Sequence, residues 1–119
     1  STTYMYIRGY KSSERIGLVS ANILDEDGLP VMDFQTDASI TMTFTVPVDT
    51  AMSSVFVERD GYYDILFDYG WSENNRKLEI NPEEPLLPGT NYEVTFDVFS
   101  EETKQRYNQN IYFMTEEEL

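Results

Sequence analysis

The chain has 119 residues, with 8 Lys and Arg against 22 Asp and Glu, so its formal net charge is −14, and it contains neither His nor Cys. Zinc sites made of His and Cys, cysteine nucleophiles and Ser-His-Asp triads are therefore excluded, which leaves only carboxylate chemistry. The negative charge also argues against nucleic acid as a partner, because binding to phosphate backbones depends on Lys and Arg.

The length is that of one domain, and a content of 40% apolar and 14% aromatic residues indicates a chain that folds around a core. Its longest apolar stretches have only a few residues, against the roughly 20 that a membrane-spanning helix requires. We therefore expect a folded domain without membrane insertion.

The first 14 residues differ from the rest of the chain. Tyr4–Arg8 is a candidate first strand, but Lys11-Ser12-Ser13-Glu14 has the composition of a linker. Arg8 and Lys11 are two of the eight positive charges of the chain. Residues 1–14 are therefore assigned to an N-terminal strand or linker, and both alternatives stay open.

Period-two alternation dominates the remainder and predicts strands. It is clearest in Ile40–Val46, where apolar residues alternate with Thr, and in Tyr92–Val98. We expect the polar members of the second segment, Glu93, Thr95 and Asp97, to face water. The expected inward side chains are Ile40, Met42, Phe44, Val46, Tyr92, Val94, Phe96 and Val98. Weaker strand candidates are Ile16–Leu24, Ser54–Glu58, Tyr63–Tyr69, Lys77–Ile80 and Ile111–Met114.

Turn residues separate these segments. Asp25-Glu26-Asp27-Gly28, Arg59-Asp60-Gly61 and Asn74-Asn75 each favour a reversal in which positive φ is tolerated. Helical spacing is nearly absent. Seven or eight short strands without a crossover helix predict an all-β fold, an antiparallel β-sandwich over residues 15–115. Residues 116–119 are assigned to an acidic tail.

The stretch Pro85-Leu86-Leu87-Pro88-Gly89-Thr90-Asn91-Tyr92 leads into a late predicted strand. A Tyr in this position suits a tyrosine corner, in which the hydroxyl bonds back to the preceding connection and pins a Greek-key crossing. The stretch also resembles the L-x-P-G-T-x-Y pattern of fibronectin type III and bacterial Ig-like domains.

Three further segments resemble, in the same order, the bacterial Ig-like domains of S-layer and other cell-surface proteins. They are Ser39–Phe44 with the following Pro47-Val48-Asp49, then Trp71–Pro82, and finally Phe113-Met114-Thr115. Glu101–Tyr107 departs from the pattern, because such domains often carry a D-x-x-G-N loop there. The resemblance implies an Ig-like Greek-key sandwich of an extracellular or cell-surface protein, which acts without catalysis as a spacer or as an adhesion or interaction module. Its implied partners are neighbouring domains of the same parent chain and a cell-wall or surface glycan.

A second family is also similar to this sequence. Ile16–Phe34, and the Leu-Leu-Pro-Gly that precedes Tyr92, resemble the carbohydrate-binding domain at the C-terminus of O-antigen ABC-transporter ATPases. That resemblance implies recognition of a polysaccharide at the cytoplasmic face of an exporter. An upstream nucleotide-binding domain in the parent chain would favour the exporter, and tandem sandwiches would favour the spacer.

Aromatic and polar residues that could bind a sugar lie in one short window. Tyr63, Tyr69 and Trp71 offer rings that stack on the C–H faces of a sugar, and Asn74 offers an amide for its hydroxyls. Alternation along Tyr63–Tyr69 favours a core face instead, and Trp71 suits the central Trp of an Ig-like sandwich. Both interpretations stay open.

The carboxylates suggest two further hypotheses. Asp25 and Asp27 could share a calcium ion with other loops at one end of a sandwich, although their spacing is not that of an EF-hand, and a plain hairpin turn is the alternative. Calcium is the only cofactor that the sequence suggests. Paired acids could hydrolyse glycosides, but 22 acids form close pairs by chance and a small sandwich offers little cleft. We expect no enzymatic activity.

Overall fold

Eight strands form two antiparallel sheets in residues 14–118, the part of the chain that the computed structural model describes. The strands are β1 (Leu18–Ala21), β2 (Ile40–Phe44), β3 (Ser54–Arg59), β4 (Tyr63–Asp64), β5 (Phe67–Ser72), β6 (Lys77–Pro82), β7 (Asn91–Phe99) and β8 (Arg106–Met114). Within this range no helix is present that could cross a membrane. The candidate strand Tyr4–Arg8 lies outside the described residues.

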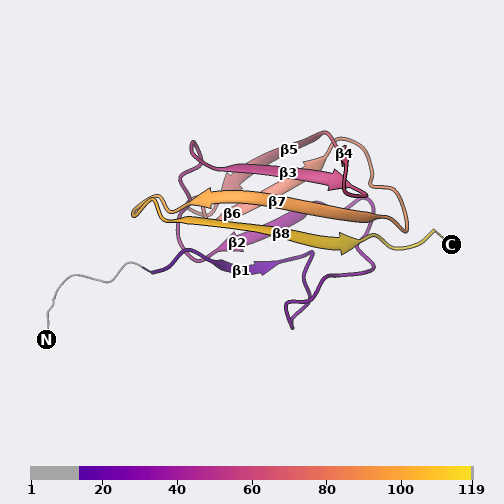
Figure 1. Cartoon of the computed structure of the whole chain (residues 1–119), viewed down its shortest axis with the longest axis horizontal. Helices are drawn as coiled ribbons and strands as arrows, with labels where there is room; N and C mark the ends of the chain where they lie inside the picture. The colour runs from indigo at the N-terminus through magenta and orange to yellow at the C-terminus, as the bar shows by residue number, and fades with distance from the viewer. Residues whose placement is uncertain (1–13, 119) are drawn as a thin grey trace, which may run out of the picture.

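The two sheets pack as the layers of a sandwich (Figure 1). One has the strand order β1-β2-β6-β5 and the other the order β4-β3-β7-β8. These orders are the A-B-E-D and C-F-G arrangements of an Ig fold, with β4 added beside strand C. The chain changes sheet between β2 and β3, β4 and β5, and β6 and β7, which gives the Greek-key connections. The predicted antiparallel Ig-like sandwich is confirmed.

Alternation in β2 and β7 builds the core as predicted. Their inward side chains are at most 2% exposed: Ile40, Met42 and Phe44 in β2, and Tyr92, Val94, Phe96 and Val98 in β7. Val46, just beyond β2, packs against this core while partly buried. The rings of Phe44 and Phe96 meet edge to face with centroids 5.4 Å apart, so the two sheets are in direct contact at this pair.

The prediction for Glu93 was wrong, because this side chain is only 8% exposed. Its carboxylate accepts a hydrogen bond from the Asn110 side-chain amide at 2.6 Å. Tyr112 pairs with Glu93 in the β7–β8 register. Long side chains of the neighbouring strand β8 therefore cover Glu93, and alternation within one strand does not reveal such a neighbour.

The predicted strand Tyr63–Tyr69 is divided between the two sheets. Tyr63–Asp64 form β4 against β3, and β5 begins at Phe67 beside β6. The division falls in between, where the Ile65 amide still donates to Val57 of β3 and the Leu66 carbonyl already accepts from Glu83 beyond β6. The single-strand prediction was therefore wrong.

The predicted turns adopt the left-handed backbone that their residues favour. Asp60 and Gly61 have φ of 53° and 85° at the β3–β4 reversal. Asn74 and Asn75 have φ of 59° and 60° between β5 and β6, and Gly28 has φ of 79°. Asn, Asp and Gly are the residues that tolerate this region at least cost, which is why the reversals fall where they do.

The tyrosine corner is confirmed at Tyr92. The Leu87 amide donates to the Tyr92 hydroxyl oxygen at 2.8 Å, and the Tyr92 side chain is only 2% exposed. Its ring stacks on Phe113 with centroids 5.7 Å apart. The bond fixes the connection that carries the chain from β6 of one sheet to β7 of the other.

Replacement of Tyr92 by Phe should lower the free energy of unfolding by about 1–2 kcal/mol, because the Leu87 amide loses its acceptor in a buried place. Chemical denaturation followed by circular dichroism measures this loss. Tyr69→Phe is the control, since Tyr69 is 53% exposed. Equal stability of Tyr92→Phe and the parent chain would show that the bond is not formed in solution.

Candidate functional site

The chain enters and leaves the sandwich at opposite ends (Figure 1). At the entering end the Ile16 amide donates to the side-chain oxygen of Gln105 at 3.2 Å, just before β8 begins. At the leaving end Thr115 and Glu116 follow the last residue of β8. The nine residues of β8 extend about 30 Å, so the two ends are separated by roughly the length of the domain.

Hydrogen bonds fasten the entering segment to the end of β2. Gly17 and Thr45 exchange two of them: the Gly17 amide donates to Thr45 Oγ1 and the Thr45 amide donates to the Gly17 carbonyl, both at 2.9 Å. The Thr45 hydroxyl in turn donates to the Arg15 carbonyl at 2.8 Å. We call Arg15–Gly17 with Thr45 the entering clamp.

A second set of bonds fastens the leaving segment. Thr115 is fully buried; its Oγ1 accepts from the Thr90 amide at 2.9 Å and its hydroxyl donates to the Leu87 carbonyl at 2.6 Å. The Phe34 amide donates to the Met114 carbonyl, and the Glu116 amide donates to the Phe34 carbonyl. We call these residues the leaving clamp, which ties the chain to two separate connections of the fold.

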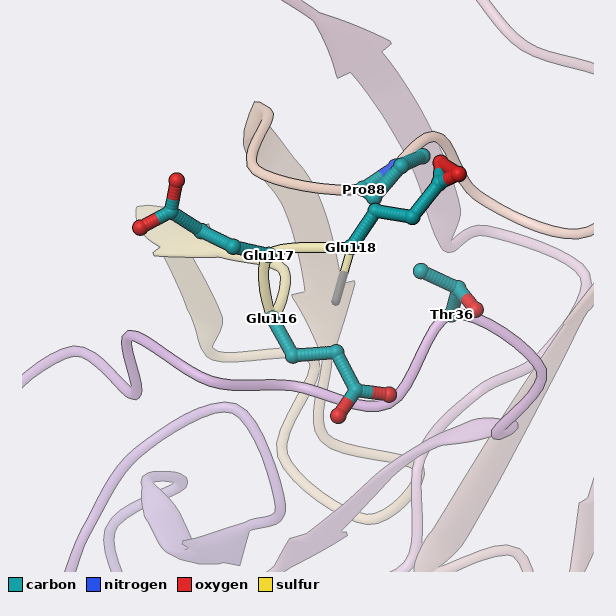
Figure 2. A pocket seen from close by; sticks show the side chains of 5 residues that line it. All are labelled: Thr36, Pro88, Glu116, Glu117 and Glu118. Carbon is teal, nitrogen blue, oxygen red and sulfur yellow. The ribbon is translucent and has the colours of Figure 1, made fainter.

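An open hollow of about 410 Å³ lies beside the leaving clamp (Figure 2). Thr36, Pro88 and the three glutamates Glu116, Glu117 and Glu118 line it. Figure 2 shows the carboxylates of these glutamates diverging, with that of Glu117 pointing away from the other two. In residues 14–118 no group of three or more acidic side chains is arranged to hold a metal ion.

The four residues predicted to bind a sugar come from different places in the fold. Tyr63 lies in β4 of one sheet, Tyr69 and Trp71 lie in β5 of the other, and Asn74 lies in the exposed turn after β5. Tyr63 meets the neighbouring Tyr62 ring at 5.3 Å. Proximity in sequence therefore does not translate into one shared aromatic surface.

Of the predicted sugar-binding residues in β5, Trp71 packs against the core of the molecule. Tyr69 and Trp71 pair in register with the buried residues Ile80 and Leu78, so they share the core-facing side of the sheet. Trp71 is partly buried with its ring 6.0 Å from Phe44, while Tyr69 stays half exposed. Trp71 thus packs as a core residue.

The predicted calcium residues form an ordered turn. Asp25 Oδ1 accepts hydrogen bonds from the amides of Asp27 and Leu29, both at 2.9 Å, and the Gly28 amide donates to the Asp25 carbonyl. These bonds hold the loop closed, and they use one of the two carboxylate oxygens of Asp25. The geometry is that of the hairpin alternative.

Sequence reasoning missed an exposed surface on the outer face of β3, β7 and β8. Phe56 and Tyr112 are each 58% exposed, and the strand register places Thr95 and the Glu93–Asn110 pair between them. Alternation in β3 was the available signal, since buried Val55 and Val57 leave Phe56 outside. The pKa of Tyr112 is raised by a hydrogen bond with Glu93, then by the charge of Glu93, by desolvation and by the charge of Glu58.

Two ion pairs lie near the connection between β7 and β8. Arg106 donates to the Asp97 carboxylate through Nε and Nη2 at 2.7 and 2.9 Å, and Lys104 donates to Asp49 at 2.7 Å. In each case the side-chain hydrogen bond from the cation is the main cause that holds the pKa of the aspartate below 3.8.

Because both aspartate pKa values are lowered by folding, these pairs stabilise the fold fully above pH 3.8 and lose their contribution as the pH falls through the folded-state values. The melting temperature should therefore decline on acidification from about pH 5 to about pH 2. In the Asp49→Asn, Asp97→Asn double variant this decline should be shallower. Parallel curves for the two proteins would contradict the assignment.

Comparison with known sequences identifies the family. The sequence model of the family described as "Bacterial Ig-like domain" matches residues 29–114 of the 119. The chain belongs to the bacterial Ig-like domain family. No curated protein matches it significantly.

Solved structures share the fold of this bacterial Ig-like domain at low sequence identity. CopC from Methylosinus trichosporium OB3b has a TM-score of 0.69 at 18% identity, over 88% of this chain and 97% of that one. Domains 1–6 of the surface layer protein SbsC match with a TM-score of 0.62 at 17% identity, over 90% of this chain and 14% of that one. The N-terminal part of the bacterial S-layer protein SbsC has a TM-score of 0.60 at 16% identity, over 87% of this chain and 24% of that one. The domain thus corresponds to a small segment of the S-layer chain.

Proposed function

We propose that this bacterial Ig-like domain is a non-catalytic structural module of a cell-surface or secreted protein, which holds its neighbours apart as a rigid spacer. The observation that carries the proposal is the position of the two clamps at opposite ends of one sandwich. Modules joined through such ends line up one after another, and each adds its own length to the chain. The likeness to segments of a bacterial S-layer protein supports a location at the cell surface.

The clamps also suit a module that is pulled from both ends. Tension applied at Arg15 and Glu116 acts along the strands, so the hydrogen bonds of the entering and leaving clamps are loaded together rather than one after another. The leaving clamp includes the buried Thr115 hydroxyl, which bonds to Leu87 and Thr90. We expect the sandwich to open in one cooperative event.

The high negative charge fits the same role. A formal charge of −14 on 119 residues keeps modules soluble and repels the anionic surfaces that surround a cell. Repulsion between successive modules would also favour an extended arrangement over a collapsed one.

The spacer proposal predicts a single cooperative unfolding event when the whole chain is stretched between its termini by force spectroscopy. Thr115→Val should lower the unfolding force and the free energy of unfolding by about 1–3 kcal/mol, because the Thr90 amide and the Leu87 carbonyl lose a buried partner. Thr43→Val in β2 is the matched control, since the Thr43 hydroxyl makes no hydrogen bond within residues 14–118. Extension without a resolvable unfolding event would contradict the spacer proposal.

A second candidate function is carbohydrate recognition on the outer face of β3, β7 and β8. The two exposed rings of Phe56 and Tyr112 favour it, because a sugar stacks on aromatic planes while the Thr95 hydroxyl and Asn110 amide between them meet its hydroxyls. This surface replaces the dispersed set of Tyr63, Tyr69, Trp71 and Asn74 as the better platform.

Glycan-array binding separates this candidate from a pure spacer. The Phe56→Ala, Tyr112→Ala double variant should lose binding of any glycan that the parent chain retains, with circular dichroism unchanged. Tyr63→Ala, Tyr69→Ala is the control, because both of its rings are also half exposed but lie in β4 and β5. Binding that survives the first pair of substitutions and fails in the second would restore the original prediction.

A further inference from the structure

Strand β8 is the longest edge strand of the described sandwich. It has nine residues, whereas the other edge strands β1, β4 and β5 have four, two and six. Edge strands are normally protected by charged side chains, Pro or bulges. Asn108–Tyr112, the middle of β8, contains none of these features.

Every second residue of this edge directs its backbone groups away from the sheet. The amide and carbonyl of Met114 bond outward, to Val31 and Phe34. Antiparallel pairing alternates strictly, so the amides and carbonyls of Asn108, Asn110 and Tyr112 also point away from β7. Among residues 14–118 these six groups have no hydrogen-bond partner. They form a template for one more strand.

A groove of about 300 Å³ runs along the same edge, lined by aliphatic side chains together with Tyr107, Gln109 and Asn110 of β8. Leu18, Leu24 and Pro30 line it on one side, and Ile111 and Tyr112 of β8 line it on the other. A strand added to the edge would place alternate side chains in this groove. Strand addition therefore offers burial of side chains as well as backbone hydrogen bonds.

We propose that Thr3–Gly9 of this same chain adds to β8 as an antiparallel strand, with Met5 and Ile7 in the groove. In the sequence Thr-Tyr-Met-Tyr-Ile-Arg-Gly these two aliphatic residues alternate with Tyr4, Tyr6 and Arg8. The alternation supplies one apolar side for the groove and one side with polar tips for water.

The length and the attachment point of the segment agree with this arrangement. Ile16 bonds to Gln105 immediately before β8, so in the proposed arrangement a strand formed from the residues before Glu14 would pair with β8 in the antiparallel direction. Thr3–Gly9 has the length of Tyr107–Phe113, and this register sets Met5 opposite Ile111 and Ile7 opposite Gln109, which both line the groove. Tyr10–Ser13 remain for the reversal, a common loop length.

Charge favours this occupant over a second copy of the domain. Residues 1–13 contain Arg8 and Lys11 and none of the 22 acids, so they are the cationic stretch of an acidic chain. Pairing of two copies would instead bring together two bodies of charge −14.

Amide hydrogen exchange measured by NMR on the full chain tests the proposal. The amides of Asn108, Asn110 and Tyr112 should exchange slowly, at rates that do not depend on protein concentration. In Met5→Asp, Ile7→Asp they should exchange about ten-fold faster or more, while Ile111, which bonds to β7, stays unchanged. The matched control Thr2→Asp, Ser12→Asp adds the same charge outside the paired segment and should behave as the parent chain.

Fast exchange of the three outward amides in the parent chain would overturn the proposal, as would protection that survives in Met5→Asp, Ile7→Asp. Protection that grows with protein concentration would also overturn it, since a second copy would then supply the strand. Asn108→Pro gives an independent check, because it removes an outward amide without breaking a β7–β8 bond. It should lower the melting temperature of the full chain and leave that of the Met5→Asp, Ile7→Asp variant unchanged.

Discussion

The edge-to-face contact of Phe44 and Phe96, with ring centroids 5.4 Å apart, joins the two sheets, and the other features of the molecule depend on it. Each ring is at most 1% exposed, and loss of one would cost about 3–5 kcal/mol. That is a large share of the roughly 5–15 kcal/mol that stabilise a domain of this size. Because the sheets are held face to face, the two clamps stay at opposite ends of one body.

The two clamps fix the points at which the chain enters and leaves the sandwich. Thr45 at one end and Thr115 at the other each use a hydroxyl to bond two separate backbone groups. These bonds hold the two ends of the chain in fixed positions relative to the sheets, as a spacer requires. The outer face with Phe56 and Tyr112 and the edge of β8 lie outside this framework, so recognition can vary there without altering the fold.

The strands with the clearest alternation were predictable because burial of one face of a strand requires apolar residues at every second position. Phe44, Phe96 and the Tyr92 corner all follow from such patterns. The division of Tyr63–Tyr69 was not predictable, since it depends on hydrogen bonds of Ile65 and Leu66 with distant strands. The sequence of one strand does not show which distant segments will form hydrogen bonds with it in the folded chain.

The candidate surfaces were less predictable than the fold for the same reason. Glu93 is buried because β8 contributes Asn110 and Tyr112, 17 residues further along in the case of Asn110. Trp71 packs on Phe44 of a non-adjacent strand rather than on a ligand. The predicted aromatic window is therefore divided between two sheets. Alternation in β3 indicates that Phe56 is exposed, but its place on one face with Tyr112 follows from the strand register.

The distance between the two ends tests the account most directly. The chain has no Cys, so Glu14→Cys and Glu118→Cys provide unique sites for spin labels in double electron–electron resonance. The account predicts one narrow distribution centred at about 30 Å or more, the length of β8. A short or broad distribution would contradict a rigid sandwich that the chain enters at one end and leaves at the other.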